Sequence, residues 1–304
     1  MSDFIPLPEP SSNQPTIQLS RLEGGYLHLP SDLFMTPNTT NTTHFRVPDM
    51  CWLLRHPSGK SMVFDLGMRK DIENFTPGVY KRLQELIKSE IPEDVFDSLR
   101  AGGVDPQKDI DLCLLSHIHY DHCGDPSKFG PNTQFMVGPG AGKLLWGENA
   151  YPVDKHSHFD SKLLPRDRAK ELPIPGEAPE GYWKPLGPFP EAHDFFGDSS
   201  VFIVNAPGHL PGHVNLLVRE RSGGWIYLAG DTAHHSDLLD GKAEVSTYTD
   251  AATGCLKCAH SDKEAAETHI KRVRRLRDEG GVEIILHHDM NWFEKNKNRF
   301  PVSS

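Results

Sequence analysis

The sequence predicts an α/β protein in which two mixed β-sheets pack on each other and helices cover their outer faces. Short apolar segments bounded by turn residues indicate strands in both halves of the chain. Segments with helical spacing follow each group of strands, so the order is strands, helices, strands and a last helix. This order is typical of layers of sheet and helix built around a shared core.

The length and charge of the chain limit its possible functions. It has 304 residues and a formal net charge of −10 at pH 7. We expect residues 1–15, rich in Pro, Ser and Asn, to form a flexible arm and residues 16–304 to form a single domain. The negative charge disfavours nucleic acid as a partner, because phosphate binding needs a basic face. No apolar run approaches the roughly 20 residues that span a bilayer, and the N-terminus lacks the features of a secretory signal. We therefore expect a cytoplasmic protein with no membrane partner.

The clearest strand signal in the first half is a hairpin. Residues 50–56 and 61–66 are largely apolar and flank Pro57-Ser58-Gly59-Lys60, which has the composition of a turn. The other elements expected in this half are strands at 16–28, 110–115 and 133–137, and helices at 80–87, 94–101 and 140–146.

The second half opens with residues 147–198, which contain many prolines and aromatics and little regular pattern. A segment of this kind is either a lid or binding loop, or a packed irregular connector, and the sequence leaves both open. The elements expected after it are strands at 200–205 and 282–286, a second hairpin formed by 214–220 and 224–229, and a long amphipathic helix at 262–277.

The segment from Ser116 to His122 carries three imidazoles and one carboxylate directly after the strand expected at 110–115. His117 and His119 are two residues apart, so they point the same way in extended chain, whereas Asp121 and His122 follow where the chain turns. Imidazole and carboxylate are ligands of zinc and related metals. This loop can therefore bind two metal ions. The alternative is that the histidines cluster by chance, since the chain has 17 of them. Further candidate ligands at the ends of later strands argue against this alternative.

Three later segments also place a histidine or aspartate at the end of an apolar strand. They supply His209 or His213, then Asp231, and then His287 or His288. Such groups are unfavourable at strand ends unless they pair or bind metal. One zinc takes about four ligands, so the set of about seven is enough for two metals about 3.5–4 Å apart.

The order of these motifs resembles the metallo-β-lactamase superfamily over about residues 45–290. The motifs are the His-x-His-x-Asp-His loop, the later Pro-Gly-His, the Gly-Asp and the terminal His-Asp. The resemblance implies a four-layer αββα sandwich with the site along one edge of both sheets. It assigns His117, His119 and His209 to the first metal, Asp121, His122 and His288 to the second, and Asp231 to a bridge between them. It favours His209 over His213 and His288 over His287, and it gives Asp65 the role of orienting the ligand loop.

Within this superfamily the chain most resembles the N-acyl homoserine lactonase branch, through residues 116–124, the hairpin at 51–68 and the helix that begins near Ser261. The resemblance implies two divalent metals, with zinc preferred and Mn, Fe or Co as options. Two cations that share a water lower its pKa to about 7, which makes hydroxide available to open a lactone. Asp121 would then pass the proton to the leaving oxygen.

One position departs from the lactonase pattern. Those enzymes place a Tyr three residues after the bridging Asp, and here that residue is His234. A histidine can donate a similar hydrogen bond to the lactone carbonyl, but it titrates near neutrality. We therefore expect hydrolysis of a lactone or ester that need not be a homoserine lactone. The expected substrate contacts are Tyr120, Trp183, Phe189 and Phe195, the last three as the wall of an apolar pocket.

Other functions could use the same ligands. A thioesterase of the glyoxalase II type would need a basic patch for its thiol carrier, for which Lys143, Lys155 and Lys162 are scattered candidates. A nuclease would need a basic groove, and a di-iron redox protein would need more carboxylate ligands. The non-enzyme alternative is a metal-binding module without turnover. A small lactone or ester is the expected partner, and a homodimer is an option that the sequence leaves open.

Overall fold

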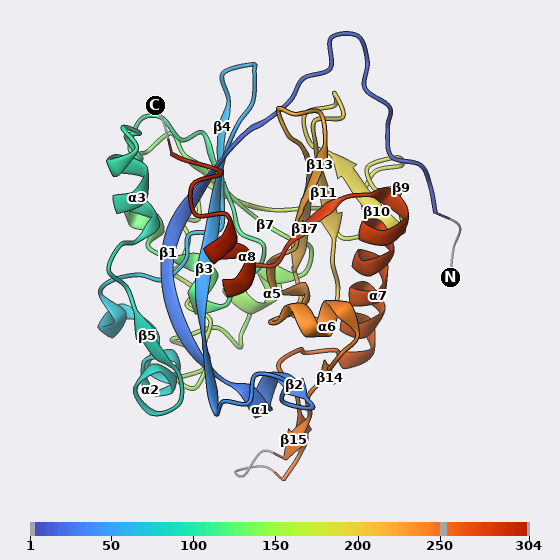
Figure 1. Cartoon of the computed structure of the whole chain (residues 1–304). Coiled ribbons are helices and arrows are strands. Elements are labelled where there is room, and N and C mark those ends of the chain that lie inside the picture. The colour runs from blue at the N-terminus through green and yellow to red at the C-terminus, as the bar shows by residue number, and fades with distance from the viewer. Residues whose placement is uncertain (1–3, 250–253, 303–304) are drawn as a thin grey trace.

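The computed structural model describes residues 4–249 and 254–302 and contains two large β-sheets that face each other (Figure 1). The first sheet has seven strands. In spatial order they are β5 (Lys88–Glu90), β1 (Gln18–Pro30), β3 (His44–Arg55), β4 (Ser61–Phe64), β6 (Leu112–Leu114), β7 (Gln134–Val137) and β8 (Ala169–Glu171). Strands β4, β6, β7 and β8 run parallel, and the other pairs are antiparallel.

The second sheet has six strands. In spatial order they are β17 (Glu283–Ile285), β13 (Trp225–Leu228), β12 (Val214–Arg219), β11 (Val201–Asn205), β10 (Phe189–Asp194) and β9 (Lys184–Leu186). Only the pair of β13 and β17 is parallel within this sheet. Both sheets are therefore mixed, and the two expected hairpins are confirmed as β3–β4 and β12–β13.

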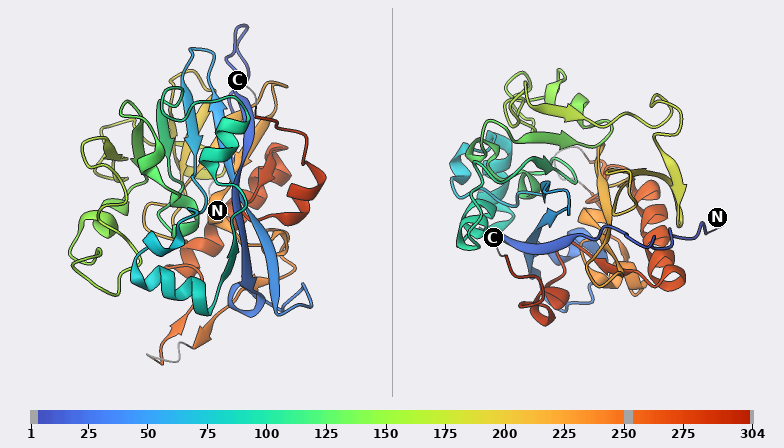
Figure 2. Two further views of the ribbon diagram at one scale, coloured as in Figure 1. Left: turned by 90° about the vertical axis from the view of Figure 1, so that its left-hand side faces the viewer. Right: turned by 90° about the horizontal axis from the view of Figure 1, so that it is seen from above.

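Helices cover the outer faces of both sheets, which gives four layers when the molecule is seen from above (Figure 2). The first sheet is covered by α2 (Pro77–Glu85), α3 (Val95–Ala101) and α5 (Ala141–Trp146), and the second by α6 (Ser236–Asp240) and α7 (Lys263–Gly280). The expected αββα sandwich is confirmed. Among the described helices, none combines the length and hydrophobicity that crossing a bilayer requires.

The alternation of side chains along β3 shows how the layers are held together. Met50, Trp52 and Leu54 contribute to the core between the two sheets. Cys51 and Leu53, which point to the opposite face, pack beneath the helices that cover the first sheet. Both faces of this strand are therefore buried. Each large apolar side chain removed from water in this way contributes about 1.5–3 kcal/mol to stability.

The segment 147–198 is a packed connector between the two sheets. It adds β8 to the edge of the first sheet and β9 and β10 to the edge of the second. The segment therefore contains more regular structure than the sequence indicated. These strands have only three to six residues, so the sequence gives too short a pattern to identify them. A lid formed by the whole segment does not occur.

The N-terminal residues run along the second sheet and make specific contacts. Ile5 forms a bridge with Gly187, and the side chain of Arg219 donates to the carbonyl of Pro8. The side chain of Gln14 donates to the carbonyl of Asp198 at 2.8 Å. Flexibility of residues 1–15 and a single domain from residue 16 onward remain predictions.

Candidate metal centre

The expected ligands lie on connections that leave one end of the two sheets. β6 leads into His117 and His119, and the short helix α4 (Tyr120–Cys123) then presents Asp121 and His122. In the second sheet, the connections after β11, β13 and β17 carry His209, Asp231 and His288, respectively. Because these strands end at the same edge of the sandwich, residues separated by more than 100 positions meet there.

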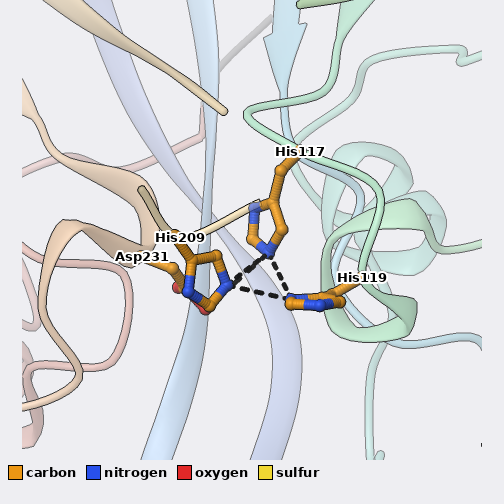
Figure 3. Close-up of side chains that lie close together, drawn as sticks. All are labelled: His117, His119, His209 and Asp231. Carbon is orange, nitrogen blue, oxygen red and sulfur yellow. Dashed lines mark hydrogen bonds and ion pairs between the residues drawn. The ribbon is translucent and has the colours of Figure 1, made fainter. Parts of the chain in front are cut away.

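The first group of ligands consists of His117, His119, His209 and Asp231 (Figure 3). The Nε2 atom of His117 lies 2.9 Å from Nδ1 of His119 and 3.1 Å from Nε2 of His209. The last two nitrogens are 2.9 Å apart. Three ring nitrogens cannot all hydrogen-bond to one another, since each is either a donor or an acceptor and two must share the same role.

The carboxylate of Asp231 lies between this first group and a second one. Its Oδ2 atom is 3.3 Å from Nε2 of His209 and 3.8 Å from Nε2 of His117. Its Oδ1 atom is 3.2 Å from Nε2 of His122 and 3.4 Å from Nε2 of His288. The second group is the expected set of Asp121, His122 and His288, and in it Asp121 lies 3.7 Å from His288. By distance alone, His287 also adjoins His122 and His288, and Asp49 adjoins Asp121 and His288. Each carboxylate oxygen of Asp231 therefore faces one group.

The donor set fits two metal ions. Nε2 of His122 and Oδ1 of Asp231 are buried and have no hydrogen-bond partner among the described residues. The nitrogens of the first group are separated by distances close to the roughly 3.3 Å expected around one tetrahedral zinc with Zn–N distances of about 2.0–2.1 Å. Burial lowers the pKa of His117 and His209 well below the usual range and that of His119 to about 3. These rings are therefore neutral, as metal ligation requires.

The electrostatics of the second group are different. Burial alone would lower the pKa of His288, but the carboxylate of Asp231 raises it to about 10. The carboxylates of Asp231 and Asp65 likewise overcome burial and raise the pKa of His122 well above its usual range. Protons on these rings balance the carboxylates in the absence of metal, and a bound cation would take over that role.

Two glycines let the chain approach its neighbours closely just before a ligand. Gly230 precedes Asp231 and has φ +46°, and a Cβ placed there would lie 2.8 Å from Nε2 of His213. Gly208 precedes His209 and has φ +129°, and its Cβ would lie 2.2 Å from the backbone nitrogen of Ala266. Both positions need a left-handed backbone and free space, so glycine is required at each.

Polar groups behind the ligands fix their orientation. Oδ1 of Asp65 accepts a hydrogen bond from the backbone of Ser116 at 2.6 Å, and its Oδ2 lies 2.9 Å from Nδ1 of His122. His213 lies outside the ligand groups, because its Nδ1 donates to the carbonyl of Ala206 and its Nε2 accepts from the backbone N–H of Asp231. These contacts hold both the ligand loop and the bridging carboxylate.

Asp49 is the main residue of the centre that the sequence analysis missed. Its carboxylate is 1% exposed, and neither oxygen has a hydrogen-bond partner in the described part of the chain. Oδ1 lies 3.3 Å from Nδ1 of His288 and 4.0 Å from Nε2 of His287. Burial raises the pKa of Asp49 to about 7. An aspartate next to the apolar strand 50–56 was the available signal, since a buried charge needs a partner.

His287 and His288 occupy different places. His288 lines the cavity described below, and its Nδ1 donates to the carbonyl of Pro48 at 3.0 Å. His287 packs its ring on His122, with centroids 4.0 Å apart, and its Nδ1 lies 3.6 Å from Asp65. His260 was also missed; its Nδ1 lies 3.2 Å from Nδ1 of His209.

A cavity of about 210 Å³ opens over the two ligand groups. Tyr120 and His234 line it, and Nε2 of His234 lies 3.2 Å from Oδ2 of Asp231. The described residues that complete its walls are Leu29, Leu33, Phe34, Arg82, Ile87, His158, Tyr248, Cys258 and Ala259.

Trp183, Phe189 and Phe195 do not line this cavity, so that part of the prediction was wrong. Phe189 is 2% exposed and stacks on Tyr227 in the core beneath α7, with ring centroids 5.2 Å apart. Phe195 lies next to Val201, at the end of β11 away from His209. Trp183 and Phe195 pack against the core between the two sheets.

The only residues of the segment 147–198 found near the centre are two from its beginning. His158 lines the cavity, and the ring of Phe159 stacks on that of His119 with centroids 6.3 Å apart. Neither was expected, because their neighbourhood carries no regular pattern from which a position could be inferred.

Comparisons with known proteins agree with this architecture. The cytochrome P450 monooxygenase mpaDE' of Penicillium brevicompactum is 28% identical over 297 residues, which cover 92% of this chain and 34% of that protein. The gamma-lactamase FDB1 of Fusarium pseudograminearum is 32% identical over 229 residues, which cover 73% of this chain and 52% of that protein. The chain thus spans only about a third to a half of the length of these two relatives.

A solved structure of an N-acyl homoserine lactone hydrolase, with the product N-hexanoyl-L-homoserine at its catalytic metal center, has the same fold. Its TM-score is 0.68 at 19% identity, and the match covers 92% of this chain and 96% of that one. A model of the metallo-beta-lactamase superfamily matches residues 46–279. The fold, the ligand groups and this match together establish that the chain belongs to the metallo-beta-lactamase superfamily.

Proposed function

We propose that this protein is a dinuclear metal-dependent hydrolase that opens a lactone ring. The observation that carries the proposal is the position of Asp231, whose two oxygens each face a separate group of ligands. Zinc is the metal we propose first, and Mn, Fe and Co accept the same ligands. The substrate is a small molecule bound in the cavity of about 210 Å³ over these groups.

The chain's own residues have distinct roles in this reaction. Two bound cations would supply water of lowered pKa and would polarise the carbonyl of the substrate. The carboxylate of Asp121 lines the cavity beside the second group, where it can hold the proton that the leaving oxygen needs. His234 also lines the cavity, and its Nδ1 has no hydrogen-bond partner among the described residues. One of its nitrogens is therefore available to the lactone oxygen.

A second candidate is the opening of a lactam ring. The 32% identity to a gamma-lactamase favours it. In both reactions, addition to the carbonyl carbon places negative charge on the former carbonyl oxygen. A lactam also needs its leaving nitrogen protonated, which places a larger demand on Asp121. The thioesterase alternative is less favoured, because it needs a basic patch and Arg82 is the only lysine or arginine among the described residues that line the cavity.

The test combines metal content with a substrate panel. Purified protein is stripped, reloaded with zinc, manganese or cobalt, and assayed with acyl homoserine lactones, aryl lactones, γ-lactams and thioesters. We expect about two ions per chain and lactone opening that is lost on stripping and restored on reloading. Full activity after exhaustive stripping would overturn the proposal, and binding without any turnover would favour the metal-binding module.

Three finer points belong to the proposal. Hydrolysis of acyl homoserine lactones in the panel would indicate a quorum-quenching role. A homodimer would be detected by the mass of the protein in solution, and a cytoplasmic location by fractionation of the source cells.

A further inference from the structure

One cation lines the cavity over the ligand groups. Arg82 lies on α2 and is half-buried there. It is the only guanidinium or ammonium group among the described side chains that line the cavity. Figure 1 shows α2 and α1 (Ser31–Phe34), which also lines the cavity, at the same end of the molecule.

Arg82 makes no ion pair with a carboxylate in the part of the chain that the structure describes. Its neighbours on the chain differ: Lys81 pairs with Glu85 one turn later on the same helix, at 3.9 Å. Arg69 binds Asp71 through two hydrogen bonds of 2.8 and 2.9 Å. The carboxylate nearest to Arg82 along its helix is thus engaged by Lys81, which points to solvent with 72% of its side chain exposed.

The groups that adjoin Arg82 include a tyrosine, a histidine and apolar side chains. Burial raises the pKa of the Tyr120 hydroxyl well above its usual range, and the charge of Arg82 and a side-chain hydrogen bond with it oppose that rise. Burial, assisted by Arg82, lowers the pKa of His158. The rest of the adjoining wall is apolar and includes Leu29, Leu33 and Ile87. Arg82 is only half-buried, and a carboxylate bound in the cavity would give its guanidinium an anionic partner.

We propose that Arg82 binds a carboxylate of the substrate, so that the natural substrate is a small cyclic ester that carries an acid group. A guanidinium offers two parallel N–H groups that match a planar carboxylate. A cavity of about 210 Å³ is below the roughly 300–1,000 Å³ of sites for larger ligands. This inference rests on the proposed hydrolase function and names its substrate class.

The reaction balances without a further reactant. Water adds its oxygen to the ring carbonyl carbon, and the bond from that carbon to the ring oxygen breaks. The ring oxygen takes one proton of the water, and the other is released to solvent as the new carboxylic acid ionises. The product is a hydroxy dicarboxylate. One carboxylate is newly formed over the ligand groups, and the other was present from the start at Arg82.

The test compares a γ-butyrolactone that bears a carboxylate with the same lactone as its methyl ester. We expect the metal-loaded protein to prefer the acid. Arg82→Gln should lower the acid-to-ester ratio of kcat/KM by about 10- to 100-fold, the worth of a charge-assisted hydrogen bond, and Arg82→Lys should retain part of the preference. Lys81→Gln, on the same helix but directed to solvent, is the matched control and should leave the ratio unchanged.

A wild-type ratio near one, or an equal loss with both substrates in Arg82→Gln, overturns the inference. If the wild type opens neither lactone, the proposed function fails and binding still decides the role of Arg82. Calorimetry with the ring-opened hydroxy dicarboxylate should then show affinity that falls about tenfold or more in Arg82→Gln but not in Lys81→Gln. Equal affinity in all three proteins, or no binding to any, overturns it.

Discussion

The two ligand groups that share Asp231 reach the same kind of site by different physical means. The first consists of three ring nitrogens, from His117, His119 and His209, which burial keeps neutral. The second combines Asp121 with two histidines whose pKa values neighbouring carboxylates raise. Burial therefore keeps the histidines of the first group neutral and ready to bind a cation, whereas the second group attracts a cation through its negative charge.

Charge behind the ligands is the reason for this difference. His122 is backed by Asp65, at 2.9 Å, and His288 by Asp49, at 3.3 Å. In the first group, His209 is instead backed by another imidazole, that of His260, at 3.2 Å. An ion bound by the second group thus neutralises more buried negative charge, and we expect it to be the more sensitive of the two to loss of a carboxylate.

The largest effect is expected from Asp231→Asn, because this residue faces both groups. Loss of an outer partner of a ligand already costs about 10- to 100-fold, so kcat/KM should fall on the order of 10⁴-fold, with both ions bound more weakly. Metal analysis after dialysis and lactone assays measure the two effects. Asp237→Asn, on α6, is the control. Two ions retained at wild-type affinity would contradict the bridging position.

Asp121→Asn should separate the two groups. It alters the second group alone, so one ion should be retained while kcat falls by about 10²- to 10³-fold through loss of the proton carrier. Titration with a chelator and steady-state kinetics report these changes. Asp125→Asn, in which Oδ1 can still accept from the backbone of Ser127, is a control in the same loop. Equal weakening of both ions would show that the groups are not independent.

Asp49→Asn tests whether a carboxylate behind His288 tunes the second group. We expect the affinity for one ion to fall by about 10- to 100-fold, while the other is unchanged. Isothermal titration of the stripped protein with zinc gives both affinities. Unchanged affinities would mean that the carbonyl of Pro48 alone orients His288.

Acid should affect the two groups oppositely in the metal-free protein. The pKa of His117 is lowered by burial, so its contribution is present above about pH 6.5 and is lost as the pH falls, by about 2 kcal/mol between pH 6.5 and 5. The pKa of His288 is raised to about 10, so its contribution is complete below about pH 6.5 and is lost as the pH rises toward 10.

Urea unfolding of metal-free proteins checks these signs. His117→Gln should reduce the loss of stability between pH 6.5 and 5. His288→Gln should be destabilised at neutral pH and approach the wild type as the pH rises toward 10. The same pH dependence in both variants would remove the electrostatic distinction between the groups.

The smallest effect is expected at His234, which adjoins the first group through Asp231. His234→Phe should lower kcat/KM by about 3- to 10-fold, the worth of one neutral hydrogen bond, and His234→Tyr should restore most of it. Two ions should be bound in both variants. A larger loss accompanied by loss of metal would instead make His234 part of the ligand set.

The sequence alone did not indicate the strands β5, β8, β9 and β10 at or next to the sheet edges, but it determined most of the other strands, both hairpins and the loops in which the ligands lie. These features depend on local pattern: alternation identifies a strand, Gly and Pro identify its end, and a histidine or aspartate that follows is carried to the sheet edge. The expected strand 110–115 and its loop therefore agree with β6, which ends at Leu114 just before His117.

Tertiary structure alone decided which side chains face one another at that edge. Asp49 behind His288 and Arg82 in the cavity wall depend on contacts between segments distant in sequence. The failure of Phe189 as a pocket residue has the same origin. Successive side chains of a strand point to opposite faces, so the sequence can place Phe189 on one face of β10. Whether that face meets the cavity or the underside of α7 depends on how helix and sheet pack.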